Sequence, residues 1–475
     1  MRSPHTLPKY LAAIIASILF LLLANPLYAY DEPPIRVGLA IEVASAAISA
    51  DKGLEIREVR NGKLIGTAPE GTKVTLKREG NEVVSSTKNR GELLAFYPKG
   101  GLLEFGGRKY RGVIDVVPDG NGLTVINVLP LEEYLRGVVP AEISPAWEME
   151  ALKAQAVAAR TYALNRMAQA TGKAFDLYAS VADQVYYGAG SEDTRTDEAI
   201  RATRGMVATY LGEPIVAYYS AGAGGCTADS AEAFGKEYPY LKPVISNDAD
   251  SYNWSLEVTA AELGGVLTKL GKECGEIKEI QINEYTNSGK ILNVKITGSK
   301  GTAIVSAVDL RRNLGYERFK SSRFTIGKDA QFPPIDVSLG SASGGVAASG
   351  REGAKVNVEV DSDYVMVISK FGPETIAIDK AIAICEGGRV SISSKCYAVG
   401  WEIVSGNPAI NAAINSSGEF KPVAVGAKVA FIGVGFGHGV GMSQVGANNY
   451  AKSGWDFSRI LLHYYTGVKL EKFYD

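Results

Sequence analysis

One helix-forming stretch near the middle of the chain, residues 144–167, constrains the fold more than any other feature of the sequence. Its apolar residues recur at steps of three and four, the spacing of a helix with one buried stripe. They are Leu152, Ala156, Ala159, Ala163 and Met167. Ser144 at the cap and Pro145 at the first helical position favour a helix start there. Because most of these side chains are short, we expect another element to pack closely against this helix.

Strand-forming runs surround this helix. Residues 35–128 consist of short β-rich runs separated by glycine turns, a pattern typical of hairpins. A short helix is predicted over residues 131–138, and further strands over residues 214–220 and 291–296. The sequence therefore predicts an α+β fold, with a β-rich N-terminal part followed by a central long helix and mixed strands.

A change of composition near residue 330 interrupts this pattern. Residues 338–350 consist almost entirely of Gly, Ser and Ala, the composition of a flexible linker. Residues 354–430 are again rich in strand-forming side chains. We therefore assign residues 331–430 to a linker and an inserted β-rich unit.

The length of 475 residues is enough for about two to four domains. After the insert, the chain ends with a glycine-rich strand and two short helices, the second capped by Asp456 and ended by Gly467. The expected units are residues 1–29, a β-rich part over 35–128, a core over 129–326, the insert over 331–430, and a C-terminal part of the core over 431–475.

The first residues of the chain have the composition of a secretory signal. Arg2, His5 and Lys9 precede an apolar run, and small residues end the segment at Ala29,. The run covers 13 residues, 11–23, whereas a membrane span needs roughly 20. Residues 1–29 are expected to be either a cleaved signal peptide or a single N-terminal anchor. The remainder is expected to be secreted or extracytoplasmic, at the cell envelope.

The charge balance argues against nucleic acid as a partner. The chain has 50 Lys+Arg and 52 Asp+Glu, and removal of residues 1–29 takes away two cations. The remaining 48 against 52 leaves a net charge of about −4, whereas nucleic-acid binding needs a basic face.

The cysteine count permits disulfides in an exported protein. Cys226, Cys274, Cys385 and Cys396 allow three connectivities,. The short spacing around a Gly-Gly pair favours Cys385–Cys396. Free thiols are equally compatible with the sequence, because a chain this long does not need disulfides to fold.

Several common enzyme classes lack their motifs here. Beyond residue 29 only His438 and His463 remain, without His-Glu-x-x-His or paired Cys-x-x-Cys, so no metal or cofactor is predicted. Ser443 follows His438 but lies in no Gly-x-Ser-x-Gly motif, and it is expected to cap a helix.

The segment Gly433-Val-Gly-Phe-Gly-His-Gly-Val-Gly441 has glycine at every second position. It does not fit Gly-x-Gly-x-x-Gly, so a dinucleotide site is not supported. In an extended strand this spacing leaves one face without side chains, so either another backbone packs there or a ligand lies along it. Phe436, His438 and Val440 would project from the other face, ahead of Ser443 and Gln444.

Glu142 is the carboxylate whose neighbours in the sequence suit a catalytic role. It lies between Pro140 and Ser144, among the apolar side chains of Val138, Val139, Ile143 and Trp147. Burial there would raise its pKa and let it donate a proton near neutrality. The N-terminus of the following helix, or a nearby arginine, would lower that pKa. On physical grounds alone, a solvated or capping glutamate is the simpler interpretation.

Two long motifs resemble the stage II sporulation protein D family, which also contains amidase enhancers. The first is Leu129-Pro-Leu-Glu-Glu-Tyr-Leu-Arg-Gly-Val-Val-Pro-Ala-Glu-Ile-Ser-Pro145, continued by Glu150-Ala-Leu-Lys-Ala-Gln-Ala-Val-Ala-Ala-Arg-Thr-Tyr162. The second is Gly435-Phe-Gly-His-Gly-Val-Gly-Met-Ser-Gln-Val-Gly-Ala447 with His463-Tyr-Tyr-Thr-Gly467. The similarity covers roughly residues 35–326 and 430–470.

This resemblance implies a peptidoglycan lytic transglycosylase, with a role in sporulation among the family's settings. Such an enzyme cleaves the MurNAc–GlcNAc bond of peptide-stripped glycan strands and closes a 1,6-anhydro ring. One carboxyl group serves as acid and then base, whereas hydrolytic glycosidases usually use two. The family's essential glutamate falls on Glu142, with Ile143 where methionine is usual.

The resemblance also implies contacts to the glycan. The expected substrate-binding residues are Arg160, Ser220, Gly435, Gly437, His438, Gly439, Ser443 and Gln444. Two departures stand out: residues 175–187 lack the His and Cys that hold zinc in some members, and Tyr219 replaces a usual histidine ahead of Ser220-Ala-Gly-Ala-Gly-Gly-Cys-Thr227.

Two classes of function follow. The first is an enzyme that cuts glycan with Glu142. The alternative is a non-catalytic amidase enhancer that binds the cell wall and stimulates an N-acetylmuramoyl-L-alanine amidase. The expected partners are peptidoglycan glycan strands and, for the alternative, a cell-wall amidase. Membrane contact is expected only through an uncleaved N-terminal segment.

Overall fold

The computed structural model describes residues 32–327, 332, 333, 335 and 420–475, together with the backbone of five strands between residues 357 and 393. Residues 1–29, the linker over 338–350 and Cys396 lie outside the described residues, so the export signal and the Cys385–Cys396 pair stay predictions. Among the helices described, none has both the length and the apolar character to cross a bilayer.

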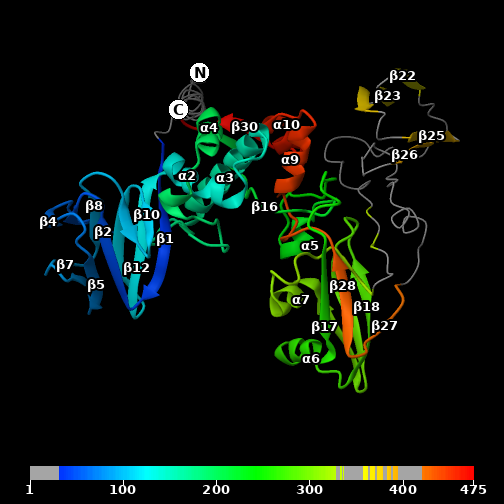
Figure 1. The fold of residues 1–475 in the computed structure, drawn as a ribbon, viewed down its shortest axis with the longest axis horizontal. Helices are drawn as coiled ribbons and strands as arrows, with labels where there is room; N and C mark the ends of the chain where they lie inside the picture. Colours follow the sequence, from blue (N-terminus) through cyan, green and yellow to red (C-terminus); the bar gives the residue numbers. More distant parts are fainter. Residues whose placement is uncertain are drawn as a thin grey trace, which may run out of the picture.

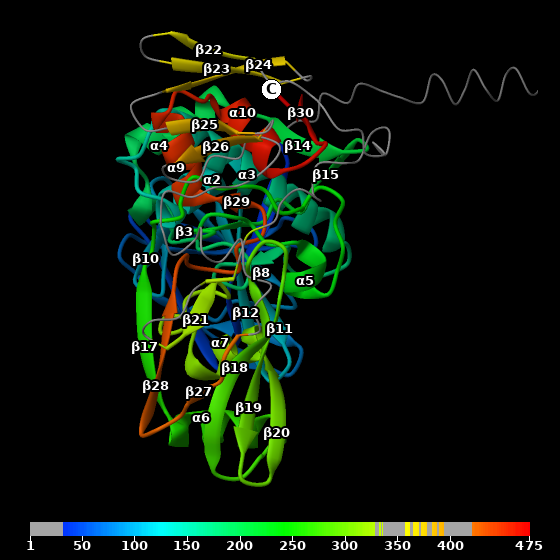
Figure 2. The ribbon, with the colours of Figure 1, turned by 90° about the vertical axis from the view of Figure 1, so that its right-hand side faces the viewer.

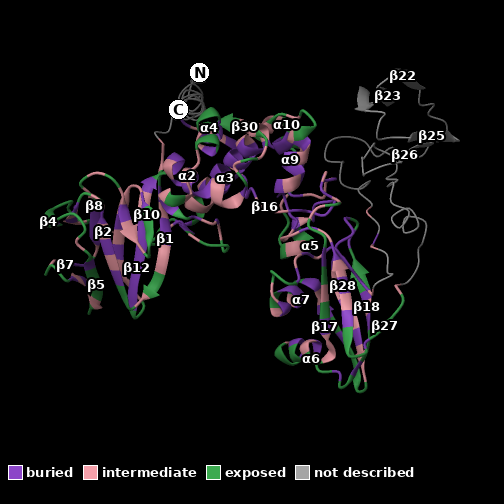
Figure 3. Ribbon diagram, viewed as in Figure 1, coloured by how far each residue is buried: buried purple, intermediate pink, exposed green. Residues whose placement is uncertain are grey.

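Two sheets with a shared core form the N-terminal unit (Figure 1). Their strands are β1 Pro34–Val43, β2 Ser45–Ala50, β3 Leu54–Glu58, β4 Leu64–Ala68, β5 Val74–Glu79, β6 Glu82–Ser85, β7 Arg90–Gly91, β8 Leu94–Pro98, β9 Leu103–Phe105, β10 Arg108–Tyr110, β11 Val113–Asp119, β12 Gly122–Pro130 and β13 Leu177–Tyr178. The orders are β13-β1-β12-β11-β8-β3-β4 and β10-β9-β2-β5-β6-β7. Buried and less buried residues alternate along β2 and β11, as Figure 3 shows for this unit. This confirms the predicted β-rich start of an α+β fold.

A helical layer lies beside this unit. Its helices are α2 Leu131–Glu142, α3 Met149–Gln169, α4 Thr194–Ala202, α9 Gln444–Lys452 and α10 Phe457–Tyr464, with a short 3₁₀ turn η1 over Gly188–Ser191. Helices α9 and α10 both contact α3, although nearly 300 residues of the chain lie between α3 and these two helices. The long central helix of the prediction is therefore the centre of this layer.

Helix α3 is buried on two faces rather than one. The predicted stripe, Leu152 to Ala163 at helical spacing, packs into the core of the N-terminal unit. A second set of small residues, including Ala154, Val157 and Ala158, packs into another core with α9 and α10. The prediction of a single buried stripe was wrong, because a helix rich in alanine admits close neighbours on both sides.

The ends of these helices differ from the prediction. Helix α3 begins at Met149, not at Pro145, because residues 144–147 form a turn in which the Trp147 amide donates to the Ser144 carbonyl at 3.1 Å. Helix α2 continues through Pro140 to Glu142, beyond the predicted end at residue 138. Its last turn is held from outside, since Tyr187 N and Ser191 Oγ donate to the Gly137 carbonyl.

Residues 213–220 contain only two short strands. Residues 214–220 were predicted as one strand, but the structure has β15 Glu213–Pro214 and β16 Tyr219–Ser220 separated by irregular chain. Strand β15 pairs with β14 Met206–Tyr210, which also pairs with β30 Lys469–Lys472 near the C-terminus. Strand β16 pairs in parallel with β29 Met442–Ser443.

A second α+β unit has its own core. It contains β17 Trp254–Thr259, α6 Ala260–Lys269, β18 Ile277–Tyr285, β19 Ile291–Gly298, β20 Gly301–Ser306, α7 Ala307–Leu314, β21 Phe324–Ile326, β27 Val423–Ala424 and β28 Lys428–Gly433. The sheets have the orders β17-β28-β21 and β20-β19-β18-β27, and β18, β19 and β20 run side by side in Figure 2. The predicted strand over residues 291–296 is confirmed as β19.

The insert is bounded by this second unit. Strands β22 Asn357–Asp361, β23 Tyr364–Ser369, β24 Gly372–Ala377, β25 Ile382–Glu386 and β26 Arg389–Ser393 lie within it. Residues 420–430, which we had assigned to the insert, instead pack with the second unit: Val423 and Val425 join its core and β28 is its central strand. The end of the insert is therefore set by the pairing of β28 with β17 and β21, which the amino-acid composition does not reveal.

Replacing residues 336–419 by a Gly/Ser linker of about twelve residues should leave the fold intact. The chain before and after the insert comes close at Gly327 and Val423, since a Cβ on Gly327 would lie 3.6 Å from the Val423 side chain. Phe332 is retained because it packs near Arg323. We expect monomeric protein with an unfolding temperature within a few degrees of the full chain, by circular dichroism and gel filtration. Aggregation of the shortened chain would show that the insert contributes to the main core.

Removing the cation of a buried ion pair should destabilise the helical layer strongly. Arg160 has no exposed surface and donates to both carboxylate oxygens of Glu132, at 2.8 and 2.7 Å, and Tyr474 donates to the same carboxylate at 2.6 Å. Arg160→Met leaves this carboxylate buried without its counter-charge, so we expect a loss of about 3–5 kcal/mol in unfolding free energy. The half-exposed Lys153–Glu150 pair on the same helix provides the control: Lys153→Met should cost less than about 1 kcal/mol in urea unfolding. Equal costs for the two variants would contradict this account.

Candidate functional site

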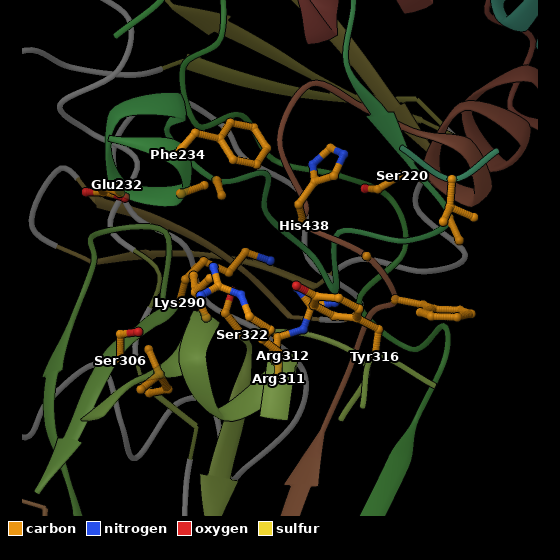
Figure 4. A pocket seen from close by; sticks show the side chains of 18 of the residues that line it. Ser220, Glu232, Phe234, Lys290, Ser306, Arg311, Arg312, Tyr316, Ser322 and His438 are labelled. Carbon is orange, nitrogen blue, oxygen red and sulfur yellow. The ribbon is translucent and has the colours of Figure 1, made fainter. Parts of the chain in front are cut away.

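A cleft of about 1590 Å³ lies between the helical layer and the second α+β unit. It is larger than the roughly 300–1,000 Å³ of most small-molecule pockets. One wall comes from the end of α2, the loop before Tyr187 and β16; the other comes from β19 and α7. In Figure 4, Ser220 and His438 lie on one side of the cleft, and Lys290, Arg311 and Tyr316 lie on the other.

Glu142 lines this cleft as the last residue of α2. The amide of Val185 donates to its Oε1 at 2.9 Å. Burial raises the pKa of the Glu142 carboxyl, and hydrogen bonds from Val185, Tyr219 and Gln444 offset only part of that rise. Glu142 sits at the C-terminal end of α2, where a negative charge is disfavoured, whereas the helix N-terminus considered as an opposing effect belongs to α3, which begins only at Met149,.

A set of buried polar side chains surrounds Glu142. Gln184 donates to the Tyr219 hydroxyl at 3.0 Å and accepts from the Tyr134 hydroxyl at 3.1 Å. Burial raises the pKa of Tyr219 well above its ordinary value, so its hydroxyl keeps its proton. Gln444 donates to Gln155 on α3 at 3.4 Å. These contacts fix the donors that face the Glu142 carboxylate.

A second carboxylate in this part of the cleft, that of Asp183, has polar partners at both of its oxygens. Asp183 pairs with Arg166 at 2.9 Å and accepts from the Tyr162 hydroxyl and the Tyr178 amide at 2.8 and 2.9 Å. Its side chain is only 2% exposed. Because these partners occupy its oxygens, Asp183 is poorly placed to activate water.

The glycine-rich segment is not the extended strand that we predicted. Gly435, Gly437, Gly439 and Gly441 all have positive φ, between 73° and 110°, a region that L side chains rarely adopt. The chain packs directly on the segment around β16: a Cβ on Gly441 would meet the Tyr218 carbonyl at 2.0 Å. Of the two interpretations left open by the sequence, close backbone packing therefore accounts for these glycines.

The structure brings together five of the nine residues that the sequence placed at the site. The cleft is lined by Glu142, Ser220, Gly437, His438 and Gln444. The residues that do not line it are Arg160, Gly435, Gly439 and Ser443. Arg160 lies in the core with Glu132, and Ser443 caps α9 as predicted while donating to Asp248 at 2.6 Å.

Each of the two histidines contacts a backbone group through a ring nitrogen. The Nδ1 atom of His438 accepts from the Val440 amide at 3.0 Å, and burial lowers the pKa of His438 to about 4. His463 contacts the Ile245 carbonyl at 2.7 Å through Nε2. It lies on α10, which Asp456 caps as predicted but which ends at Tyr464, before Gly467.

The described part of the chain contains no group of three or more His, Cys, Asp or Glu arranged to hold a metal ion. Cys226 and Cys274 are buried free thiols, and burial raises the pKa of Cys226 to about 12.

Sequence reasoning missed several residues of the site. Gln184 and Val185 lie in the stretch that it examined only for zinc ligands, and Tyr219 appeared only as a replacement for histidine. Lys290 and Arg311, on the far wall, lie outside both motifs. Only the fold brings these residues to Glu142.

Comparisons with known proteins agree with the motifs. A family model described as stage II sporulation protein matches residues 119–210, and a model of a domain of unknown function, DUF8618, matches residues 235–340. Glu142 and Val185 thus fall in the first match, and Lys290 and Arg311 in the second.

Three relatives are similar over larger parts of the chain. An uncharacterised protein of Brachyspira hyodysenteriae is 32% identical over 307 residues, 61% of this chain and 81% of the relative. The amidase enhancer of Bacillus subtilis is 25% identical over 402 residues, 73% of this chain and 54% of the relative. Stage II sporulation protein D of Bacillus subtilis is 31% identical over 189 residues, 34% of this chain and 55% of the relative.

The chain thus spans little more than half the length of each of the two Bacillus subtilis proteins. Helices α2, α3 and α4 of its helical layer, with Glu142 at the cleft, lie in the region matched by the family model, whereas α9 and α10 lie outside it. By this match and these relatives, the chain belongs to the stage II sporulation protein D family.

Proposed function

We propose that this protein is an exported lytic transglycosylase that cleaves MurNAc–GlcNAc bonds in peptide-stripped glycan strands, with Glu142 as its general acid and base. The observation that carries the proposal is the setting of Glu142: a carboxyl with a raised pKa, held by the Val185 amide, at the wall of a cleft large enough for several sugars.

The proposed reaction needs only one proton shuttle. Protonated Glu142 gives its proton to the glycosidic oxygen as the bond from that oxygen to C1 of MurNAc breaks. The C6 hydroxyl of the same MurNAc then attacks C1, and the Glu142 carboxylate takes the hydroxyl proton. The products are a 1,6-anhydro end and a free 4-hydroxyl end, without consumption of water. A raised pKa keeps more of the carboxyl in the proton-donating form near neutrality.

The state of Asp183 supports a lytic rather than a hydrolytic reaction. Hydrolytic glycosidases usually pair an acid with a second carboxylate that activates water or forms a covalent bond. Asp183 lines the same part of the cleft, but Arg166, Tyr162 and Tyr178 hold its oxygens.

The remaining predicted residues divide into two roles. Ser220, Gly437, His438 and Gln444 are proposed to contact the glycan, since they line the cleft. Arg160, Gly435, Gly439 and Ser443 are proposed to position these contacts from behind the wall. The partner is a glycan strand outside the cytoplasm, in keeping with a family that acts on the cell wall, and residues 1–29 would direct export.

The alternative is a non-catalytic amidase enhancer. It is favoured by the similarity to the Bacillus subtilis amidase enhancer, which extends over 73% of this chain. In that function the cleft would bind glycan without cutting it, and the protein would stimulate an N-acetylmuramoyl-L-alanine amidase.

Glu142→Gln should abolish cleavage while leaving binding intact. The amide keeps the volume of the side chain but cannot shuttle a proton, so we expect a loss of at least about 10²–10⁴-fold in the rate. The measurement is mass spectrometry of 1,6-anhydro ends released from amidase-stripped glycan strands, with binding followed by strand pull-down.

Glu198→Gln is the matched control, since Glu198 is exposed on α4 and does not line the cleft. This variant should cleave like the wild type. Normal cleavage by Glu142→Gln would remove Glu142 from the mechanism. A wild-type protein that never cleaves, but raises the rate of an added amidase, would establish the enhancer function instead.

The raised pKa of Glu142 also predicts a pH-dependent stability difference. The folded pKa lies above the ordinary 4.5, so protonation stabilises the fold below about pH 4.5, and this stabilisation disappears as the pH rises through the folded pKa. Glu142→Gln should therefore unfold near the wild-type temperature at about pH 4 and above it at about pH 7.5. Differential scanning calorimetry at both pH values checks this; a variant less stable than wild type at the higher pH would contradict the pKa assignment.

A further inference from the structure

The wall of the cleft opposite Glu142 contains two buried cations. Lys290 immediately precedes β19 and is 4% exposed, and Arg311 lies in the last turn of α7 and is 8% exposed. Both line the cleft and are labelled on the same side of it in Figure 4, and, in addition to burial, the charge of Arg311 lowers the pKa of Lys290. Their positive charges both lower the pKa of His438, so both lie close to that ring.

Neither cation forms an ion pair with an acid among the described residues. Lys290 donates to the Ala223 carbonyl, and Arg311 donates to the Phe319 and Lys320 carbonyls at 3.1 and 2.8 Å. A nearby acid, Asp248, already accepts from two backbone amides and from Ser443. Buried charges without a counter-charge are costly, which indicates that an anion completes this wall.

A further feature, on the wall that faces the two cations, suits a bound ligand. The Ser220 hydroxyl is buried and has no hydrogen-bond partner, although it faces the cleft. The backbone of Gly439 packs closely on Lys290, since a Cβ at Gly439 would lie only 3.2 Å from the ammonium nitrogen. The two cations and this hydroxyl thus line the same cleft, which has room for a small anionic group.

We infer that Lys290 and Arg311 form a carboxylate-binding subsite that recognises the lactyl carboxylate of a peptide-stripped MurNAc residue. This inference rests on the proposed function for its substrate class. Removal of the peptide stem turns an amide at the lactyl ether into a free carboxylate, so this anion distinguishes a stripped strand from an intact one.

The same contacts explain a preference for stripped strands. A carboxylate can accept from both cations and leave Ser220 as a further donor, since charge-assisted hydrogen bonds are the strong ones. A peptide amide at that position brings no charge and would leave both cations unpaired. The second α+β unit would thus supply selectivity, while the helical layer supplies the proton shuttle.

The test compares binding of two glycans to the full-length Glu142→Gln protein, which prevents cleavage. One glycan is amidase-stripped strand, and the other is the same strand with its lactyl carboxylates converted to methylamides. We expect about 10- to 100-fold weaker binding of the capped strand, as for loss of a hydrogen bond to a charged group. Adding Lys290→Gln should weaken binding of the free-carboxylate strand by a similar factor and leave binding of the capped strand unchanged.

Lys278→Gln is the matched control: it removes the same charge from the exposed face of β18, away from the cleft. It should bind both strands as the parent protein does. Equal binding of free and capped strands by the parent protein would overturn the inference, and so would a Lys290→Gln loss of equal size on both.

A third experiment tests whether the subsite binds a carboxylate or a phosphate group. If a glycerol-phosphate polymer displaces stripped strands while capping has no effect, the site serves phosphate and the inference is wrong. These outcomes are independent of catalysis. A wild-type protein that does not cleave, yet binds in a carboxylate-dependent way, would overturn the lytic proposal and leave the subsite standing.

Discussion

The buried pair between Glu132 and Arg160 holds the architecture together. It joins α2 to α3 in the interior, and Tyr474 adds the C-terminal end of the chain to the same carboxylate. Burial opposes the charge on Glu132, but the hydrogen bonds and charge of Arg160 lower its pKa below the ordinary value. With these helices fixed, α3 can serve two cores at once, and the end of α2 is held at a defined place beside the cleft.

The candidate site follows from where α2 ends. Glu142 is its last residue, so the carboxylate meets the loop of Gln184 and Val185 on one side and the segment of Tyr219 and Gln444 on the other. Partial burial and the negative end of the helix both favour the protonated form. The neighbouring Asp183 instead pairs with Arg166, so two carboxylates that line the same cleft have different surroundings.

The two walls of the cleft come from different parts of the chain. The family match covers α2, α3 and α4 of the helical layer, whereas Lys290 and Arg311 belong to the unit matched by a domain of unknown function. The proposed proton shuttle and the proposed carboxylate subsite thus belong to different units of one protein. The glycine segment joins them, because its positive-φ residues let it pack on the chain around β16 without side chains in the way.

The sequence by itself determined the α+β class, the caps at Asp456 and Ser443, and Glu142 as the residue to examine, because periodicity, cap chemistry and family motifs are local signals. The tertiary structure decided the rest. The second buried face of α3, the assignment of residues 420–430 to the second unit, and the folding of the glycine segment all depend on partners distant in the chain. So does the cleft: Arg160, named with the site, is in the core, whereas Tyr219, Lys290 and Arg311 line it. Long-range packing brings such residues together, and no local pattern records it.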